Sequence, residues 1–297
     1  MTYTWSEMIT VFTPTYNRAH LLPRLYESLC QQTFKDFEWV IVDDGSTDNT
    51  ESVIQPWIDT HIIPVRYYKQ ENGGKHRAIN RGVKEAKGEL FFIADSDDML
   101  PPDALQHVTK VYEQIKEDFS FAGVCGIDGT FDGRVIGSGL PQEVMDVNAI
   151  DLRIKYGVTG DMKEVFRTSV MKDFPFPEIP GEKFCPEMLV WNRIAKKYKL
   201  RYFNKVIYLA EYQADGITSG IVRARMNSPV ASMMTYAEMT RYEGVPLQQK
   251  VKAAVNYWRF RLCRKAKGNE SIPKLKWYYN LFMPLGWMMH VKDKFCC

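Results

Sequence analysis

The sequence predicts an α/β protein built on an open, mostly parallel sheet. Short apolar runs, rich in aromatic and β-branched residues, alternate with segments of helical periodicity over the first hundred residues. Three of these runs end in polar clusters, and ligands of open α/β sheets bind where parallel strands end. Alternation of strand and helix is typical of βαβ units with right-handed crossovers.

The elements expected in the first half of the chain follow from these runs and from their turn residues. Strands are expected at 8–13, 39–42, 65–68 and 90–94. Helices are expected at 20–32, 46–57, 75–87 and 103–117, with Ser46 as N-cap of the second and Gly88 ending the third. Strands at 121–127 and 134–136, around the Asp132-Gly133 turn, would add antiparallel members to the sheet.

The second half reads as an irregular region followed by helices. An irregular proline- and aromatic-rich loop (173–186), a helix (187–197), a strand (206–212) and a glycine-containing loop (213–220) come first. From about residue 223 the pattern is helical, with breaks expected near 244–246 and 271–273.

The stretch 91–98 (FFIADSDD) places three carboxylates directly after a buried strand. Carboxylates this close repel one another, and a divalent cation held by one or two of them, by water and by substrate phosphates relieves the repulsion. A solvated acidic turn that caps the next helix is the alternative. No G-x-G-x-x-G follows the first strand and no G-x-x-x-x-G-K-[ST] occurs, which argues against a dinucleotide-type Rossmann site and a P-loop.

Composition is that of a globular protein, with 45% hydrophobic and 25% charged residues. The six cysteines show no disulfide or metal spacing, so we expect a reducing, cytoplasmic compartment. We identify no signal segment and no apolar run of about 18 residues that would span a bilayer. Net charge is +9 over residues 246–297 and −6 over the rest, which predicts an anionic surface as a partner of the C-terminal region.

Five segments, in order, resemble the family-2 glycosyltransferases with a GT-A fold, of the bacterial surface-polysaccharide type. They are 11–18 (VFTPTYNR), 42–48 (VDDGSTD), 73–80 (GGKHRAIN), 88–98 (GELFFIADSDD) and 186–193 (PEMLVWNR). The resemblance covers roughly residues 8–215 and implies a GT-A domain at 1–222, with a nucleotide-binding half (1–100) and an acceptor half (101–222). Residues 223–297 form a helical, basic and aromatic appendage.

The resemblance implies a nucleotide-sugar site. Thr13, Pro14 and Tyr16 would line the base pocket, and Asp44 would accept a hydrogen bond from a uracil N–H, since an ionised carboxylate accepts but cannot donate. A packed turn aromatic is the alternative for Tyr16, and compensation of a helix dipole is the alternative for Asp43 and Asp44.

Cationic and amide side chains at the start of the third helix suit a pyrophosphate or a ribose. Lys75, Arg77 and Asn80 are the candidates, and a solvated helix-start charge is the alternative for Lys75.

The family's D-x-D motif maps onto Asp95-Ser96-Asp97. By resemblance Asp95 contacts the ribose, Ser96 belongs to the nucleotide-sugar site and Asp97 holds Mn²⁺ or Mg²⁺. Asp98 is an additional carboxylate, either a group behind the metal site or a helix cap.

The family's catalytic base is a carboxylate near a helix start, four residues before an aromatic, and Glu187 stands in that relation to Trp191. The family usually has Glu-Asp there, where this chain has Pro186-Glu187, and a first-turn Glu serving the helix dipole is the alternative. Asp161 and Trp191 are candidates for acceptor binding. The Gln-x-x-Arg-Trp signature of processive synthases is absent, which favours addition of a single sugar.

The C-terminal region combines aromatics with lysines. Residues 274–290 contain Trp277, Tyr278, Phe282 and Trp287 flanked by Lys, which fits an interfacial amphipathic helix. A helical cap packed on the domain is the alternative, and nucleic-acid binding is disfavoured because no binding motif occurs.

We therefore expect an inverting, metal-dependent glycosyltransferase, peripheral on the cytoplasmic face of the cell membrane. It would move one sugar from a UDP-sugar or related nucleoside-diphosphate sugar to a hydroxyl of a lipid-linked glycan. The rival interpretations are transfer to a polyprenyl phosphate and a non-catalytic nucleotide-sugar-binding scaffold.

Overall fold

The computed structural model describes residues 7–210, 220–264 and 274–296. These residues form two compact units, which we describe separately. Residues 7–73, 77–175 and 193–210 belong to the first unit, and residues 74–76, 176–192, 220–264 and 274–296 belong to the second.

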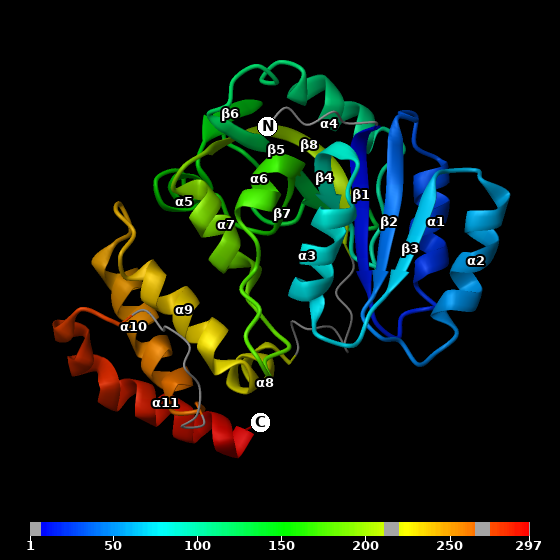
Figure 1. Ribbon diagram of the computed structural model, residues 1–297. Coiled ribbons are helices and arrows are strands. Elements are labelled where there is room, and N and C mark those ends of the chain that lie inside the picture. The colour runs from blue at the N-terminus through cyan, green and yellow to red at the C-terminus, as the bar shows by residue number, and fades with distance from the viewer. Residues whose placement is uncertain (1–6, 211–219, 265–273, 297) are drawn as a thin grey trace. The chain divides into compact units, whose positions relative to one another are not determined.

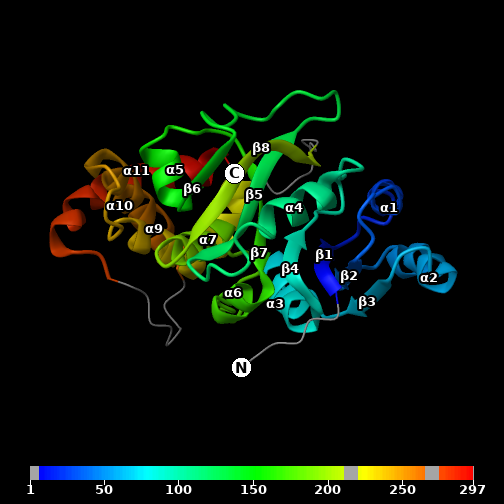
Figure 2. The same cartoon turned by 90° about the horizontal axis from the view of Figure 1, so that it is seen from above.

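One eight-stranded sheet is the frame of the first unit, in the order β3-β2-β1-β4-β7-β5-β8-β6 (Figure 2). Its strands are β1 (Glu7–Thr15), β2 (Phe37–Asp43), β3 (Val65–Lys69), β4 (Gly88–Ile93), β5 (Phe121–Gly129), β6 (Val144–Val147), β7 (Met162–Arg167) and β8 (Lys199–Leu209). The half from β3 to β4 is parallel. Strand β7 enters antiparallel to both β4 and β5. The predicted parallel sheet with antiparallel members is confirmed.

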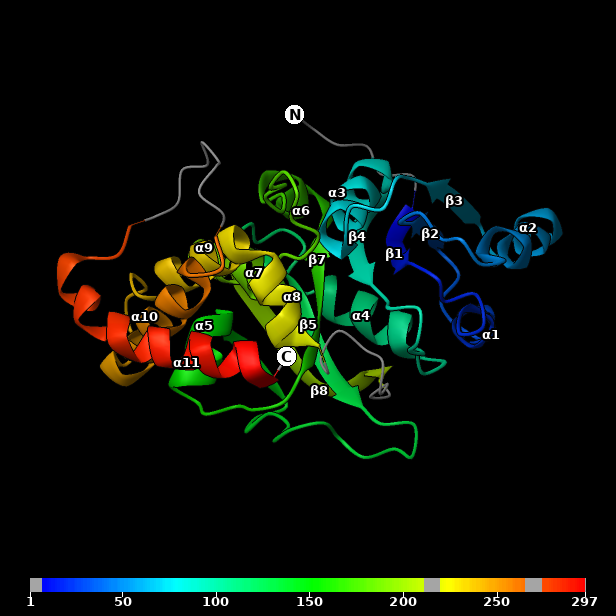
Figure 3. The same ribbon diagram turned by 90° about the horizontal axis from the view of Figure 1, so that it is seen from below.

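Helices cover both faces of this sheet. They are α1 (Leu22–Cys30), α2 (Thr50–Thr60), α3 (Lys75–Glu85), α4 (Ala104–Tyr112), α5 (Ala149–Ile154) and α6 (Thr168–Asp173). Helix α7 (Glu187–Ala195) begins in the second unit. Figure 3 shows α1 and α4 on one face of the parallel half and α3 and α6 on the other. Because strand side chains alternate between faces, Val11, Ile41 and Phe92 join the core under α1 and α4.

Phe12 points to the other face, where α3 approaches the sheet closely at Gly82. A β-carbon on Gly82 would lie 2.2 Å from the Phe12 ring. Phe12 in turn stacks on Phe91 of β4, with 5.1 Å between ring centroids. The missing side chain at Gly82 therefore lets the helix carrying Arg77 and Asn80 lie directly on the strands.

Several local predictions were wrong. Residues 134–136 contribute one isolated bridge, from Val135 to Gly129, because the Asp132-Gly133 turn continues into an irregular loop. Ser46 is not the N-cap of α2, which begins at Thr50; its hydroxyl accepts the Asn17 N–H instead.

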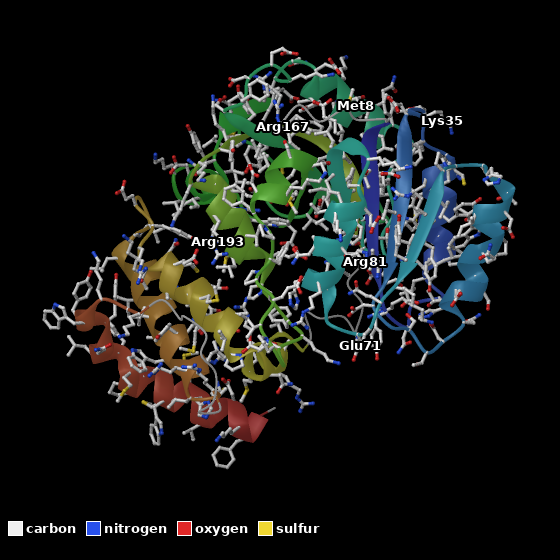
Figure 4. The ribbon with its side chains drawn as sticks, viewed as in Figure 1. Met8, Lys35, Glu71, Arg81, Arg167 and Arg193 are labelled. Carbon is white, nitrogen blue, oxygen red and sulfur yellow. The ribbon has the colours of Figure 1, made fainter. Side chains whose placement is uncertain are left out.

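Elements β6, α5, β7 and α6 were not predicted, and β8 begins at Lys199 rather than at residue 206. Strand β7 was not predicted because charged residues interrupt its apolar pattern. One of them is Arg167, which is only 6% exposed. The Arg167 guanidinium, labelled in Figure 4, donates to the carbonyl oxygens of Ile115, Lys116 and Asp118. The predicted loop at 213–220 and the break near 271–273 fall on residues outside the described part, except for Gly220.

The second unit is mainly helical. It contains α8 (Ile221–Asn227), α9 (Pro229–Met239), α10 (Leu247–Arg261), the 3₁₀ helix η1 (Trp277–Phe282) and α11 (Met283–Cys296). The predicted break near 244–246 is confirmed by the gap between α9 and α10. Helix α10 lies between α9 and α11 (Figure 1), and Tyr236 stacks on Phe260 with 5.9 Å between centroids. Among the described helices, none is long and apolar enough to cross a membrane.

Helix α9 is capped by a carboxylate from a distant loop. Glu182 is 6% exposed, and its two oxygens accept the N–H groups of Val230 at 2.6 Å and Ala231 at 2.9 Å. The neighbouring Phe184 N–H donates to Ser228 Oγ at 3.0 Å. These bonds satisfy the first turn of the helix, favour its dipole and fix the loop that leads into α7.

We predict that Glu182→Gln destabilises the protein by about 1–3 kcal/mol, because the amide keeps one acceptor and loses the charge that pairs with the helix start. Chemical denaturation monitored by circular dichroism measures the change in the free energy of unfolding. Glu243→Gln makes the same substitution at an exposed position of the same unit and should change stability by less than about 0.5 kcal/mol. Equal effects of the two variants would contradict the capping role.

Candidate functional site

The turns that follow β1 and β2 are joined by hydrogen bonds. Asn17 has φ +52°, and its N–H donates to Ser46 Oγ at 2.8 Å. Its side-chain oxygen accepts the Thr47 N–H at 2.8 Å. The Ala19 N–H donates to Asp48 Oδ2 at 3.1 Å. Because the two strands are parallel neighbours, their ends form one polar edge.

Asp44 lies at this edge as a rigid acceptor. It is 4% exposed, and Oδ1 accepts from Gln70 Nε2 at 2.7 Å and from the Gly73 N–H at 3.0 Å. Asn72 Nδ2 donates to Oδ2 at 3.1 Å. The donors come from the segment between β3 and α3, so the carboxylate is oriented before any ligand arrives.

Asp43 differs from its neighbour. It is fully buried, and it accepts the Ser46 N–H at 2.7 Å and the Tyr67 hydroxyl at 2.7 Å. These two bonds organise the turn after β2. Burial and the Asp43 carboxylate raise the pKa of the Tyr67 hydroxyl.

The residues predicted for a base pocket lie at the end of β1 but differ in exposure. Thr13 is fully buried, and its Oγ1 accepts from Trp39 Nε1 at 2.9 Å, so its side chain belongs to the packing of the sheet. Pro14 is also buried. Tyr16 is 47% exposed, which leaves its ring available for stacking.

The carboxylate loop, residues 95–98, follows β4 at the same edge. Ser96 and Asp98 are 7% exposed, whereas Asp95 and Asp97 are partly exposed. The Ala94 N–H donates to the Phe12 carbonyl at 2.8 Å, which continues the pairing with β1 up to the loop. The structure thus brings Asp44 and the D-x-D residues to one edge of the sheet, as parallel topology requires.

Asp98 is not a helix cap, since the N-cap residue of α4 is Asp103. Its Oδ2 accepts the Tyr208 hydroxyl at 2.7 Å. Burial and the neighbouring Asp95 raise the pKa of Asp98 to about 7, while Lys163 opposes the rise. Sequence reasoning missed Tyr208 and Lys163, because no local signal links them to this loop.

Helix α3 brings further polar side chains to this region of the chain. Arg77 Nη1 donates back to the Gly73 carbonyl at 3.0 Å. Asn80 follows one turn later and is partly exposed. Asp161, predicted for acceptor binding, is exposed just before β7.

In the second unit, Lys75 and Glu187 form an ion pair. Lys75 Nζ lies 2.9 Å from Glu187 Oε1, and the two side chains are 28% and 39% exposed. Gly74 has φ +99°, and a β-carbon there would lie 1.9 Å from the Lys183 carbonyl oxygen, so only glycine lets this segment pack against that loop. Trp191 on α7 contacts Phe176 edge-on, with 5.6 Å between centroids.

The model of the family described as glycosyl transferase family 2 matches residues 10–164, just over half of the chain. The chain belongs to this family. The predicted family is thereby confirmed, and the matched range contains β1 to β5 and the D-x-D motif.

The curated relatives of this family-2 chain are named as glycosyltransferases. The chain is 29% identical over 178 residues to the poly(ribitol-phosphate) beta-N-acetylglucosaminyltransferase TarS of Staphylococcus aureus, covering 57% of this chain and 29% of TarS. It is 28% identical over 218 residues to the GalNAc(5)-diNAcBac-PP-undecaprenol beta-1,3-glucosyltransferase of Campylobacter jejuni, covering 71% and 67%. The chain spans about a quarter to a third of the length of TarS and of two Rickettsia relatives.

Solved structures show that the fold is GT-A, as predicted. A TarS fragment in complex with UDP-GlcNAc superimposes with a TM-score of 0.65 at 20% identity, covering 94% of this chain and 79% of that one. The mannosyltransferase PcManGT of Pyrobaculum calidifontis, in complex with GDP-Man and Mn²⁺, gives 0.57 at 17% identity, covering 99% and 91%.

Asp128 of β5 is a buried carboxyl near this site. It is 4% exposed, and its Oδ1 has no hydrogen-bond partner among the described residues. Burial raises the pKa of Asp128 to about 6, Lys163 opposes the rise, and Asp161 and Asp95 add to it. A carboxyl with a raised pKa binds its proton more tightly in the folded protein than in the unfolded one. The free energy of unfolding therefore falls as pH rises from about 4 to about 6.

We predict that Asp128→Asn removes this contribution and raises the free energy of unfolding at pH 7 by up to about 3 kcal/mol, at about 1.4 kcal/mol per pKa unit. Denaturant unfolding of both proteins at pH 4, 5, 6 and 7 measures this change in the free energy of unfolding. Asp173→Asn, at an exposed carboxyl of the same unit, controls for loss of one negative charge. A variant whose stability follows the wild-type pH curve would show that Asp128 is solvated.

Proposed function

We propose that this family-2 enzyme transfers one sugar from a uridine-diphosphate sugar to an acceptor hydroxyl, with inversion at the anomeric carbon. The observation that carries the proposal is the sheet edge of the first unit. There the preoriented Asp44 and the partly exposed Asp95 and Asp97 follow neighbouring parallel strands. The complex of TarS with UDP-GlcNAc supports a UDP-linked donor.

Asp44 would recognise the base. Its carboxylate is fixed by three donors and offers about four acceptor positions, so it suits a uracil N–H, which donates. The exposed ring of Tyr16 would stack on the base. Thr13 and Pro14 shape the strand end from beneath, and Arg77 and Asn80 of α3 would meet the ribose and diphosphate.

Asp95 and Asp97 fit a divalent cation only together with the diphosphate. Among the described residues, no group of three or more His, Cys, Asp or Glu could hold a metal ion alone. Mg²⁺ and Mn²⁺ sites of nucleotide enzymes commonly use one or two carboxylates plus substrate phosphates. We propose that Asp97 holds the cation and that Asp95 and Ser96 meet the ribose. When bound, the cation supplies positive charge to the departing diphosphate.

Glu187 is the proposed general base. Its ion pair with Lys75 orients the side chain, and a carboxylate is a group that can take a proton from an acceptor hydroxyl. The acceptor oxygen would give its proton to Glu187 and attack the anomeric carbon as the bond to the diphosphate breaks. A single displacement of this kind inverts the configuration.

The acceptor we propose is a hydroxyl of a lipid-linked glycan, with Asp161 and Trp191 as contact residues. The support is the name of the Campylobacter relative, which acts on an undecaprenol-linked glycan. Direct transfer to a polyprenyl phosphate is the second candidate. A phosphate acceptor is already ionised and needs no base, so the effect of substituting Glu187 distinguishes the two.

We predict that Glu187→Gln lowers the transfer rate to a hydroxyl acceptor about 10²–10⁴-fold while the Kd for UDP changes less than about twofold, because the amide keeps the shape and loses the basicity. Transfer kinetics and calorimetric titration with UDP measure the two quantities. Glu178→Gln, in the same loop, is the matched control. Loss of UDP affinity together with rate would assign Glu187 to the structure of the loop.

Exposed apolar side chains on the second unit support a proposed location at the cytoplasmic face of the membrane. We call them the aromatic surface; it comprises Trp277, Leu281, Trp287, Met288 and Phe295, which are 56–86% exposed. Exposed lysines flank it at positions 274, 276, 292 and 294. Apolar side chains flanked by ammonium groups suit an anionic bilayer. Attraction to the anionic headgroups contributes about 1 kcal/mol of binding free energy for each basic residue at the surface.

We predict that a fourfold substitution by serine, at Trp277, Leu281, Trp287 and Phe295, weakens co-sedimentation with phosphatidylglycerol vesicles at least about tenfold. The reason is that each Å² of apolar area withdrawn from water contributes about 25 cal/mol to binding. High salt should release part of the wild-type protein, because screening shortens the reach of its charges. The control, Ile62→Ser with Phe119→Ser, removes exposed apolar side chains from the first unit. Vesicle binding that survives the fourfold substitution would refute this surface as the membrane contact.

A further inference from the structure

Tyr208 joins the carboxylate loop to the far half of the sheet. It lies near the end of β8, is 1% exposed, and its single hydroxyl makes two hydrogen bonds to the loop. The oxygen accepts the Asp95 N–H at 2.7 Å, and the hydroxyl donates to Asp98 Oδ2 at 2.7 Å. One atom thus fixes the backbone at the start of the loop and the side chain at its end.

Two further features hold the ring in place. Phe92 of β4 packs against it, with 6.1 Å between ring centroids. Lys163 of β7 places its ammonium 3.4 Å from the ring centroid on the face of the phenol. A cation over the ring face is attracted to its electrons, so Phe92 and Lys163 both hold the ring while its hydroxyl bonds to the loop.

The backbone after the loop is paired to the same strand. The Met99 N–H donates to the Leu209 carbonyl at 3.0 Å, and the Leu209 N–H donates to the Met99 carbonyl at 2.9 Å. Arg24 of α1 donates to the Asp97 carbonyl. Backbone and buried side chains therefore hold the loop, and Asp95 and Asp97 keep partly exposed side chains.

We propose that Tyr208 is a positioning residue that sets the placement of Asp95 and Asp97 for the metal-bound diphosphate. The inference rests on the proposed function of those two carboxylates. A site of this kind must hold its ligands within about 0.5 Å, and residues behind metal ligands typically contribute 10–100-fold to affinity. Tyr208 acts through the loop backbone and Asp98, so we expect the lower end of that range.

The test uses the full chain, with UDP titrated by calorimetry in the presence and absence of Mn²⁺. In Tyr208→Phe the ring stays and both hydrogen bonds to the loop are lost. We expect the Kd for UDP with Mn²⁺ to rise about tenfold, with less than about a twofold change when Mn²⁺ is absent. Tyr202→Phe is the matched control, since Tyr202 lies on the same strand and is equally buried, at 1% exposed.

The outcomes separate the possible roles. If Tyr208→Phe and Tyr202→Phe lower the melting temperature alike and leave the Mn²⁺ dependence unchanged, Tyr208 is structural and the inference is wrong. Asp98→Ala breaks the same contact from the other side, and the effects of the two substitutions should be less than additive. Additive effects would also overturn the inference. Absence of Mn²⁺-dependent UDP binding in the wild type would refute the proposed function itself.

Discussion

The buried carboxylates that follow β2 and β4 need hydrogen-bond donors in place of water, and this requirement shapes these strand ends of the first unit. Asp43, Asp44 and Asp98 are each less than a tenth exposed. A buried carboxylate without donors costs several kcal/mol, so every turn around them is arranged to supply N–H or O–H groups. The donors come from the turn after β2, from the segment before α3 and from β8. The hydrogen bonds that satisfy these buried carboxylates also hold their oxygens in fixed positions, ready to accept from a ligand.

Most of the parallel half could be predicted from the sequence because its strands are mainly apolar and aromatic runs, and three of them end in polar clusters. Strand β7 could not, since Lys163 and Glu164 interrupt the pattern and Arg167 is buried only because three carbonyl oxygens surround it. The placement of Asp44 and the D-x-D residues at one edge followed from topology. The bond between Tyr208 and Asp95 spans 113 residues, and the bond between Glu182 and Val230 spans 48. Contacts between residues this far apart in the chain produce no periodic pattern in the sequence, so they could not be predicted from it.

The ion pair of Lys75 with Glu187 orients the two side chains more than it stabilises the fold. Both side chains are about a third exposed, and exposed pairs contribute little to the free energy of folding. The Lys75 ammonium carries three N–H donors, and it directs one side of itself to a Glu187 oxygen at 2.9 Å. The sequence suggested Lys75 for a pyrophosphate or a ribose, with a solvated helix-start charge as the alternative. Its observed partner, Glu187, gives the same side chain a second role, the orientation of a carboxylate.

The C-terminal helices are coupled to this pair by packing within one unit. Glu182 and Phe184 bind the start of α9, and the loop they belong to leads directly into Glu187. Helix α10 packs between α9 and α11, where Gly286 lets α11 approach Trp258 closely. The aromatic surface and the proposed base therefore share one rigid frame. A unit that rests on a bilayer through that surface would hold Glu187 at a fixed height above the lipid. If the acceptor is a hydroxyl of a lipid-linked glycan, as we propose, this fixed height would bring the base to that hydroxyl and give the basic, aromatic helices a role in catalysis.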